Sequence, residues 1–299
     1  MMTTDILEQF SEALADRLAA AASFTVAVRT GRRDRSGILW RDDAVVTSEQ
    51  VLPDGTDFTV VRNGTEIPAR LAGRDPGTNV AVLRLAQGLG GSLFETSPAP
   101  RTGSLVLLVG ADGTGAPTGR LGMVHATGPA WHSMAGGRID TLLRLDARLG
   151  SDEGGPILTL GGKMIGMSTA GPRRRALVIP AATIERVLDP LLTEGRIARG
   201  WFGVGLQHVL VPERMREAAG RDRGMMVVGL APGAPAEQAG VLPGDIILEV
   251  DGRHTGGRAR GLASALGPER IGQPVTLKLL RAGVVHLVTI VIGAHPTRA

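Results

Sequence analysis

The stretch of sequence that decides the fold is Asp152-Glu153-Gly154-Gly155-Pro156. Two earlier segments, Ser36 to Val51 and Asp75 to Leu83, each contain short apolar runs of the kind that forms strands. The glutamate stands directly before the two glycines, and a carboxylate is a weak nucleophile towards amides. The chemistry available to the chain therefore depends on which polar residues these three segments contribute.

Length and composition indicate a folded chain of many short strands. The 299 residues can bury a sizeable core, and this length suggests about two domains. Hydrophobic residues make up 43% and charged residues 21%, which is ordinary for a folded soluble protein. The 43 glycines and 18 prolines favour turns and short strands over long helices. The chain has no cysteine, which excludes disulfides and thiolate chemistry.

The isoelectric point of about 10.7 suggests a nucleic-acid binder, but the formal net charge is only +4. Lys163 and Lys278 are the only lysines, and tyrosine and cysteine are absent, so little titrates between histidine and arginine. Arg173-Arg174-Arg175 is the only tight basic cluster. We therefore expect no nucleic-acid partner. The alternative, an arginine-mediated nucleic-acid or membrane binder, predicts an affinity that falls steeply with salt.

The N-terminal residues 1–22 contain four acidic residues and no apolar run that resembles a signal peptide. No segment of the chain approaches the roughly 20 apolar residues that span a bilayer. We therefore expect a cytoplasmic chain without a transmembrane segment. Residues 5–21 have apolar residues at helical spacing, which predicts a helix that packs on the neighbouring domain, with an oligomerisation element as the alternative.

Short strands separated by turn residues fill the chain from Phe24 to Ile179. We expect them at 24–28, 37–40, 44–47, 58–61, 67–71, 80–85, 105–109, 119–127, 141–145, 157–160, 164–168 and 176–179. A helical pattern from Ala181 to Leu192 ends at Gly195. The second unit has strands at 224–230, 245–250, 275–281 and 284–292, and helices at 234–239 and 258–266. This pattern predicts an antiparallel sandwich or pair of barrels, followed by a small α+β domain.

Three segments together resemble the HtrA/Deg family of trypsin-like serine proteases with a C-terminal PDZ domain. Residues 36–51 look like the family's "SG…VTNxHV" stretch, and residues 75–83 look like its "DxxTDLAVL" stretch. Asp146-Ala147 followed by Gly154-Gly155-Pro156 looks like "TDAxINPGNSGGP", with one residue fewer in between. The segment Leu177 to Pro180 looks like the family's "FAIP" strand.

The resemblance covers the chain from about Phe24 to Gly293 and implies a mainly β fold. It implies a chymotrypsin/trypsin-like double six-stranded β-barrel followed by a small α+β PDZ domain. The implied division is an N-terminal helix (1–22), a trypsin-like domain (23–180), a linker helix (181–199), a PDZ domain (200–294) and a tail (295–299).

The family's catalytic triad positions carry different residues in this chain. Gln50 matches the general-base histidine, Asn79 the orienting aspartate, and Glu153 the nucleophilic serine. An amide does not titrate near neutral pH, so Gln50 cannot accept a proton from a nucleophile. The resemblance therefore implies a pseudoprotease, that is, a scaffold or regulator that is not an enzyme.

The alternative is an active serine endopeptidase of HtrA type that uses a non-standard site. Ser151 lies two residues before Glu153, and His125 or His132 would have to come within hydrogen-bond reach of its hydroxyl. The six histidines are dispersed without metal-ligand spacing, and no glycine-rich segment carries the Lys-Ser/Thr of a phosphate-binding loop. We expect no metal and no cofactor.

The segment Arg199-Gly200-Trp201-Phe202-Gly203-Val204 resembles the carboxylate-binding loop of the family's PDZ domains, and residues 239–247 resemble its "AGLxxGDxI" turn. The resemblance implies that protein C-termini or extended peptides bind as an added strand. Trp201, Phe202, Gly203 and Val204 would bind the peptide carboxylate, with Arg199 adding electrostatic attraction. Leu262 and Leu266 would line the pocket for the last peptide residue. The simpler interpretation of Trp201 and Phe202 is that both are core aromatics.

Two implications of the resemblance meet conflicting features in the chain. Family members commonly form trimers through an aromatic-bearing N-terminal segment, but Phe10 is the only aromatic before Phe24. The sequence therefore allows a homo-oligomer but does not predict a trimer. Bacterial members usually work outside the cytoplasm, which conflicts with the cytoplasmic location expected from residues 1–22.

Overall fold

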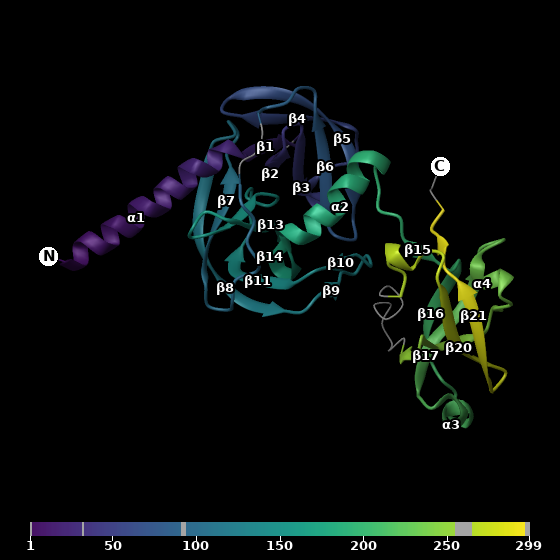
Figure 1. Cartoon of the computed structure of the whole chain (residues 1–299). Coiled ribbons are helices and arrows are strands. Elements are labelled where there is room, and N and C mark those ends of the chain that lie inside the picture. The colour runs from purple at the N-terminus through teal and green to yellow at the C-terminus, as the bar shows by residue number, and fades with distance from the viewer. Residues whose placement is uncertain (1, 32, 91–93, 255–264, 297–299) are drawn as a thin grey trace. The chain divides into compact units, whose positions relative to one another are not determined.

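The structure is a computed structural model that describes residues 2–31, 33–90, 94–254 and 265–296. Contacts divide the chain into two compact units. The first comprises Met1–Trp131 and Ile139–Ile197, and the second comprises His132–Arg138 and Ala198–Ala299. Figure 1 shows the elements of both units.

The first unit begins with a closed antiparallel barrel of six strands in the order β1-β2-β3-β6-β5-β4. Its strands are β1 (Thr25–Arg29), β2 (Asp34–Arg41), β3 (Ala44–Ser48), β4 (Asp57–Arg62), β5 (Thr65–Asp75) and β6 (Val80–Leu85). The β4–β5 hairpin turns at Asn63-Gly64, where both residues have positive φ, +49° and +77°. Such a turn matches the twist of the paired strands, which explains the Asn-Gly sequence there.

A second closed barrel follows, with the strand order β11-β14-β13-β12-β7-β8. Its strands are β7 (Leu105–Ala111), β8 (Pro117–Gly128), β11 (Leu142–Arg148), β12 (Pro156–Thr159), β13 (Met164–Ala170) and β14 (Arg175–Pro180). A separate two-stranded sheet pairs β9 (Trp131–His132) with β10 (Arg138–Ile139). The two six-stranded barrels confirm the mainly β, trypsin-like fold expected from the sequence.

The first unit also carries two α-helices, α1 (Met2–Ala20) and α2 (Ala181–Glu194). Helix α2 ends at Gly195, which adopts φ +73° as the sequence pattern predicts. The described residues of this unit also form three short 3₁₀ helices: η1 (Ala21–Ser23), η2 (Glu49–Val51) and η3 (Pro172–Arg174). Within the described ranges, none of the helices has the combination of length and apolar character that crossing a bilayer requires.

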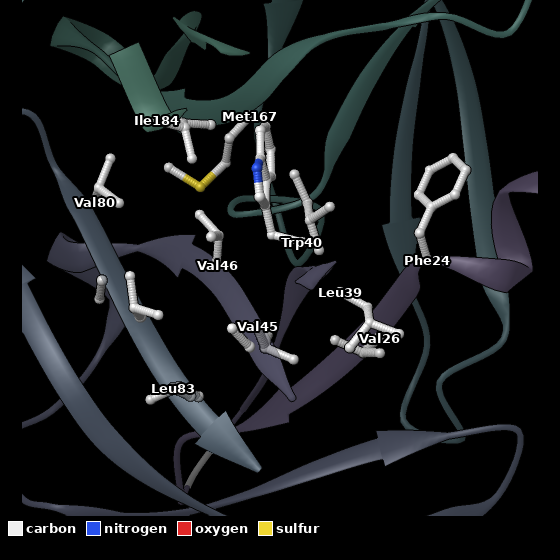
Figure 2. Packing of buried hydrophobic residues seen from close by; sticks show 14 of the residues in the cluster. Phe24, Val26, Leu39, Trp40, Val45, Val46, Val80, Leu83, Met167 and Ile184 are labelled. Atoms are coloured by element: carbon white, nitrogen blue, oxygen red, sulfur yellow. The ribbon is translucent and has the colours of Figure 1, made fainter. Parts of the chain in front are cut away.

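One hydrophobic cluster joins both barrels and helix α2. Figure 2 shows Ile184 of α2 pointing towards Met167 of β13, with Val46 of β3 and Trp40 of β2 beside them. The indole N–H of Trp40 donates to Oε1 of Glu185 at 2.5 Å, so its polar atom is satisfied at the edge of the core. Burial of each large apolar side chain contributes roughly 1.5–3 kcal/mol, so α2 is fixed on the barrels mainly by this packing.

Helix α1 packs on the barrel only near its C-terminal end. A Cβ at Gly119 of β8 would lie 2.9 Å from Leu18, so these two residues are in close contact. Ile6 and Leu7 are 62% and 68% exposed, and Phe10 is also exposed. The helix expected over residues 5–21 is present and packs on the domain through Leu18, whereas Ile6 and Leu7 stay exposed.

The second unit is built on one sheet with the strand order β16-β17-β18-β20-β21, and β19 pairs with β18. The strands are β16 (Val204–Leu210), β17 (Arg223–Leu230), β18 (Ile246–Val250), β19 (Arg253–His254), β20 (Pro274–Arg281) and β21 (Val284–Val291). A two-stranded sheet pairs β15 (Gly200–Trp201) with β22 (Gly293–Ala294). Among its described residues, the short helices are α3 (Arg216–Ala219), α4 (Pro235–Gln238), η4 (Glu213–Met215) and η5 (Pro268–Arg270).

The helix expected at 234–239 is found as α4. The helix expected at 258–266 falls largely outside the described residues, as does Leu262.

Candidate functional site

The structure brings together the three residues that stand at the triad positions. Gln50 lies in η2, Asn79 in the turn between β5 and β6, and Glu153 in the turn before β12. Nε2 of Gln50 donates to Oε1 of Glu153 at 2.5 Å. The backbone N–H of Gln50 donates to Oδ1 of Asn79 at 2.8 Å. Two segments of the first barrel and one of the second therefore build this polar cluster.

The turn at Asp152–Gly155 fixes the position of Glu153. Gly154 has φ +94°, and a Cβ there would lie 2.2 Å from the carbonyl oxygen of Ser36. Only glycine fits this position, because both the backbone angle and the close approach exclude a side chain. The N–H of Gly154 donates to the carbonyl of Ser168 at 2.9 Å, and the hydroxyl of Ser168 donates to the carbonyl of Asp152 at 2.8 Å. The turn is thus attached to β13.

The carboxylate of Glu153 is buried and hydrogen-bonded. The residue is 3% exposed, and its Oε1 also accepts the backbone N–H of Ala170 at 3.0 Å. The guanidinium of Arg174 lies 3.8 Å from Oε2. A buried carboxylate is stable in this position because an amide, a backbone N–H and a cation surround it.

Asn79 is held by two buried hydroxyls. Its Nδ2 donates to Oγ of Ser48 at 3.1 Å and also to Oγ1 of Thr169. These two hydroxyls lie 3.1 Å apart, and both residues are buried. The same Oγ1 of Thr169 accepts a hydrogen bond from Nε2 of Gln50 at 3.1 Å. Asn79 thereby positions Gln50 beside Glu153.

Sequence reasoning did not identify Thr169, Ala170 and Arg174 as members of this cluster. Thr169 and Ala170 belong to β13, whose sequence reads as an ordinary apolar strand, so no signal marks them. Arg174 is part of the basic cluster at 173–175, whose sequence does not indicate a role in this site. The assembled cluster contains amides, hydroxyls, one carboxylate and one guanidinium, and it contains no imidazole.

Ser151 lies at the surface beside this cluster and lines two cavities. One has a volume of about 330 Å³ and the other about 390 Å³. Ser151 is exposed, and its carbonyl accepts the hydroxyl of Ser36 at 2.9 Å. Within the described parts of the chain, neither His125 nor His132 forms a hydrogen bond with Ser151. His125 is an exposed residue of β8, and His132 groups with the second unit.

The predicted carboxylate-binding loop lies between β15 and β16. Gly203 has φ +79°, and a Cβ there would lie 2.1 Å from Cβ of Ala234. The carbonyls of Phe202 and Gly203 accept the N–H groups of Ala236 at 2.9 Å and Ala231 at 2.8 Å. The loop is therefore fixed through its carbonyl groups against the segment that leads into α4.

The side chains of this loop have different environments. Phe202 is 1% exposed and belongs to the hydrophobic cluster of the second unit, while Val204 and Leu266 are partly buried against it. Trp201 is partly exposed, and its ring lies 5.8 Å from that of His295. Phe202 is therefore a core aromatic, as the simpler interpretation of the sequence predicts. The peptide-binding roles of Trp201, Phe202, Gly203 and Val204 stay predictions.

An ion pair between the buried Asp245 and the partly exposed Arg281 supports the turn that precedes β18. Asp245 is 1% exposed and receives both Nε and a terminal nitrogen of Arg281, each at 2.7 Å. It also accepts the N–H of Leu242 at 2.8 Å. Burial raises the pKa of Asp245, but the hydrogen bonds from Arg281 and Leu242 outweigh it, and the pKa lies below its usual range.

Comparisons with known protein families agree with this architecture. The family of trypsin-like peptidase domains matches residues 35–167, and the PDZ domain family matches residues 226–281. Among solved structures, the serine endoprotease from Yersinia pestis is 26% identical, with a TM-score of 0.69 over 96% of this chain and 98% of that one. The HtrA-type protease AlgW with a tripeptide is 25% identical, with a TM-score of 0.71 over 95% and 98%.

Two curated relatives carry the name probable periplasmic serine endoprotease DegP-like. The relative from Rhizobium meliloti (strain 1021) is 31% identical over 279 residues, which are 90% of this chain and 55% of that protein. The relative from Marinomonas sp. (strain MWYL1) is 30% identical over 284 residues, 89% of this chain and 58% of that protein. The chain thus spans about half the length of the curated relatives it matches.

These names correct two predictions. The prediction that the chain is not an enzyme is contradicted, because the relatives are named serine endoproteases. The residues at positions 50, 79 and 153 exclude only a mechanism that uses those three groups, and other hydroxyls such as that of Ser151 remain. The prediction of a cytoplasmic location is also contradicted, because the relatives are named periplasmic. The acidic residues at 1–22 describe that segment alone and not the compartment.

The double barrel, the PDZ fold and these matches all lead to the same assignment. The chain belongs to the HtrA/DegP-type family of trypsin-like serine proteases with a PDZ domain.

Proposed function

We propose that this chain recognises the C-terminal carboxylate and last apolar residues of polypeptides at its PDZ domain. The observation that carries this proposal is the placement of Gly203 directly before β16, which is an edge strand of the described sheet. An edge strand presents unpaired N–H and C=O groups to which an extended peptide can add. The peptide chain would pair with β16, and its carboxylate would lie at the loop.

The loop has the features that carboxylate capture requires. The carbonyl groups of Phe202 and Gly203 are occupied by Ala236 and Ala231, which turns the carbonyls towards the protein. The N–H groups at residues 202–204 are the donors that we assign to the carboxylate, as in backbone capture of peptide termini. Val204 and Leu266 lie partly buried beside the loop and would contact the last peptide side chain.

Hydrogen–deuterium exchange of the full chain tests where the peptide lies. A saturating decapeptide that ends in Ala-Val-Leu should slow amide exchange in Val204–Leu210. Because β21 is the opposite edge of the same sheet, it provides an internal control. Protection confined to Val284–Val291 would contradict the proposal.

Endopeptidase activity is a second candidate function, favoured by the names of the relatives. In this chain we assign the nucleophile to Ser151, because it is exposed, lines both cavities and lies two residues from Glu153. Its hydroxyl would need a base to approach, with a histidine as the candidate. The same names favour an extracytoplasmic location, where unfolded polypeptides would be the substrates.

A fluorophosphonate probe tests the second candidate, because it reacts only with an activated serine. Labelling of the full chain that disappears in Ser151→Ala and persists in Ser97→Ala supports hydrolysis through Ser151. Labelling that persists in Ser151→Ala would exclude this residue as the nucleophile. Absence of labelling in the parent chain would exclude an activated serine.

A further inference from the structure

The cavity of about 330 Å³ beside Ser151 has an unusual lining, and we call it the arginine pocket. Its charged residues are Arg33, Asp34, Arg35, Asp112 and Arg174. They come from the start of β2, the β7–β8 turn and η3, so three separate segments of the first unit place their charges around one space. The three arginines include one from the basic cluster at 173–175, which has no role in the function proposed above.

Two of the arginines are anchored by backbone carbonyls in the turn that leads to Glu153. A terminal nitrogen of Arg35 donates to the carbonyl of Gly150 at 3.0 Å. Nε and a terminal nitrogen of Arg174 donate to the carbonyl of Leu149 at 3.1 and 3.0 Å. A guanidinium has five N–H donors, so each anchored side chain keeps donors for a ligand. Nε of Arg35 is buried and has no hydrogen-bond partner among the described residues.

The arginines of the pocket outnumber the acidic residues that line it. Arg33, Arg35 and Arg174 line the pocket together with Asp34 and Asp112. Oδ1 of Asp112 is already occupied by the N–H of Thr114 at 2.8 Å, its hydroxyl at 2.6 Å and the N–H of Ala116 at 3.0 Å. Among the described residues, Asp34 forms no ion pair with the pocket arginines. Oε2 of Glu153 lies 3.8 Å from Arg174 outside the lining.

The backbone that carries Arg174 is strained. Arg173 and Arg174 both have φ +57°, in the left-handed region that side chains with a Cβ disfavour. Residues in this conformation cluster at ligand clamps because the surrounding structure must hold them there. Here the carbonyl of Leu149 and the carboxylate of Glu153 hold Arg174 at the pocket.

We propose that the arginine pocket binds a side-chain carboxylate, from aspartate or glutamate, of a polypeptide that lies along the first unit. Guanidinium groups match carboxylate geometry with paired, charge-assisted hydrogen bonds, and the two anchored arginines supply such donors. The identity of the ligand as a polypeptide rests on the proposed function. The pocket itself is independent of the PDZ loop, since all of its residues belong to the first unit.

The test uses two octapeptides that are acetylated and C-terminally amidated, so neither offers a terminal carboxylate to the PDZ domain. One has the sequence Ala-Ser-Ala-Glu-Glu-Ala-Ser-Ala, and the other has two glutamines in place of the glutamates. The Nε–H signals of the arginines in the full, ¹⁵N-labelled chain are followed by NMR and assigned with single arginine-to-lysine variants. Inorganic phosphate is titrated separately, because it shares the chemistry of an oxyanion.

We expect a saturable shift of the Arg35 and Arg174 signals with the glutamate peptide, and about tenfold weaker binding of the glutamine peptide. Arg33→Gln should weaken binding about tenfold, whereas the exposed control Arg101→Gln should leave it unchanged. Because Arg33 is exposed, its substitution should not disturb the fold. Equal shifts with both peptides, no saturable shift, or tighter binding of phosphate than of the glutamate peptide would each overturn the proposal. None of these results depends on the PDZ domain.

Discussion

Nε2 of Gln50 and Oε1 of Glu153 lie 2.5 Å apart although 103 residues separate them in the chain. The two side chains occupy positions where the family carries a base and a nucleophile, and here they satisfy each other as donor and acceptor. The contact closes the first barrel onto the turn before β12. The hydrogen bond between Gln50 and Glu153 therefore contributes to the stability of the site.

Replacement of Glu153 by serine should leave the hydrolysis rate of a casein substrate equal to that of the parent chain. The new hydroxyl would stand beside Gln50, whose amide cannot accept its proton, and general-base catalysis typically contributes 10²–10⁴-fold. The triple variant with Gln50→His, Asn79→Asp and Glu153→Ser is the comparison in which a base is present. A gain of tenfold or more from Glu153→Ser alone would contradict this account.

Gln50→Ala should lower the free energy of unfolding by about 1–3 kcal/mol, because the buried carboxylate of Glu153 loses a hydrogen-bond donor. Urea denaturation at neutral pH measures the change. Gln87→Ala removes an exposed amide from the same unit and should change stability by less than about 0.5 kcal/mol. Equal effects of the two substitutions would show that the contact contributes no stability.

Acid should destabilise the second unit through Asp245. Its pKa is below the usual value when folded, so the stability that it contributes is fully present above its unfolded pKa of about 3.9. That stability is lost as pH falls through the lower, folded pKa. Asp245→Asn should abolish this part of the pH dependence, as followed by denaturant unfolding between pH 6 and pH 2. An unchanged acid slope in the variant would contradict the assignment to Asp245.

Gly203→Ala should destabilise the second unit by at least about 1–2 kcal/mol, because φ is +79° and the new Cβ would lie 2.1 Å from Cβ of Ala234. Thermal unfolding measures the loss. Gly229→Ala is the matched control, since a Cβ there meets nothing within 4 Å. If both variants unfold at the same temperature, the loop is not held in the conformation described.

Much of the fold could be predicted from the sequence because its turns and apolar runs carry local signals. Gly195 ends helix α2 as the pattern indicates, and Gly154 and Gly203 stand where the backbone admits only glycine. Gln50, Asn79 and Glu153 could be predicted to meet because three motifs fixed their places. Local patterns do not show which strand residues face them, so Thr169 and Ala170 were missed.

The packing of residues 5–21 and the activity of the chain could not be predicted from the sequence, for physical reasons. The apolar spacing of residues 5–21 predicts a helix but does not specify what covers its apolar face, and Ile6 and Leu7 are exposed. Gln50, Asn79 and Glu153 exclude the family's triad mechanism, but they do not decide whether the chain hydrolyses peptides in another way. The names of the relatives therefore overturned the predictions of a non-enzyme and of a cytoplasmic location.

A matched pair of peptides tests whether the PDZ loop captures a peptide carboxylate. Fluorescence anisotropy of the full chain would compare a labelled decapeptide that ends in Ala-Val-Leu with a free carboxylate and the same peptide with a terminal amide. We predict that the free acid binds at least about tenfold more tightly, because charge-assisted hydrogen bonds to backbone N–H groups are lost in the amide. Equal affinity of the two peptides, or no binding of the free acid, would show that the loop does not capture the carboxylate.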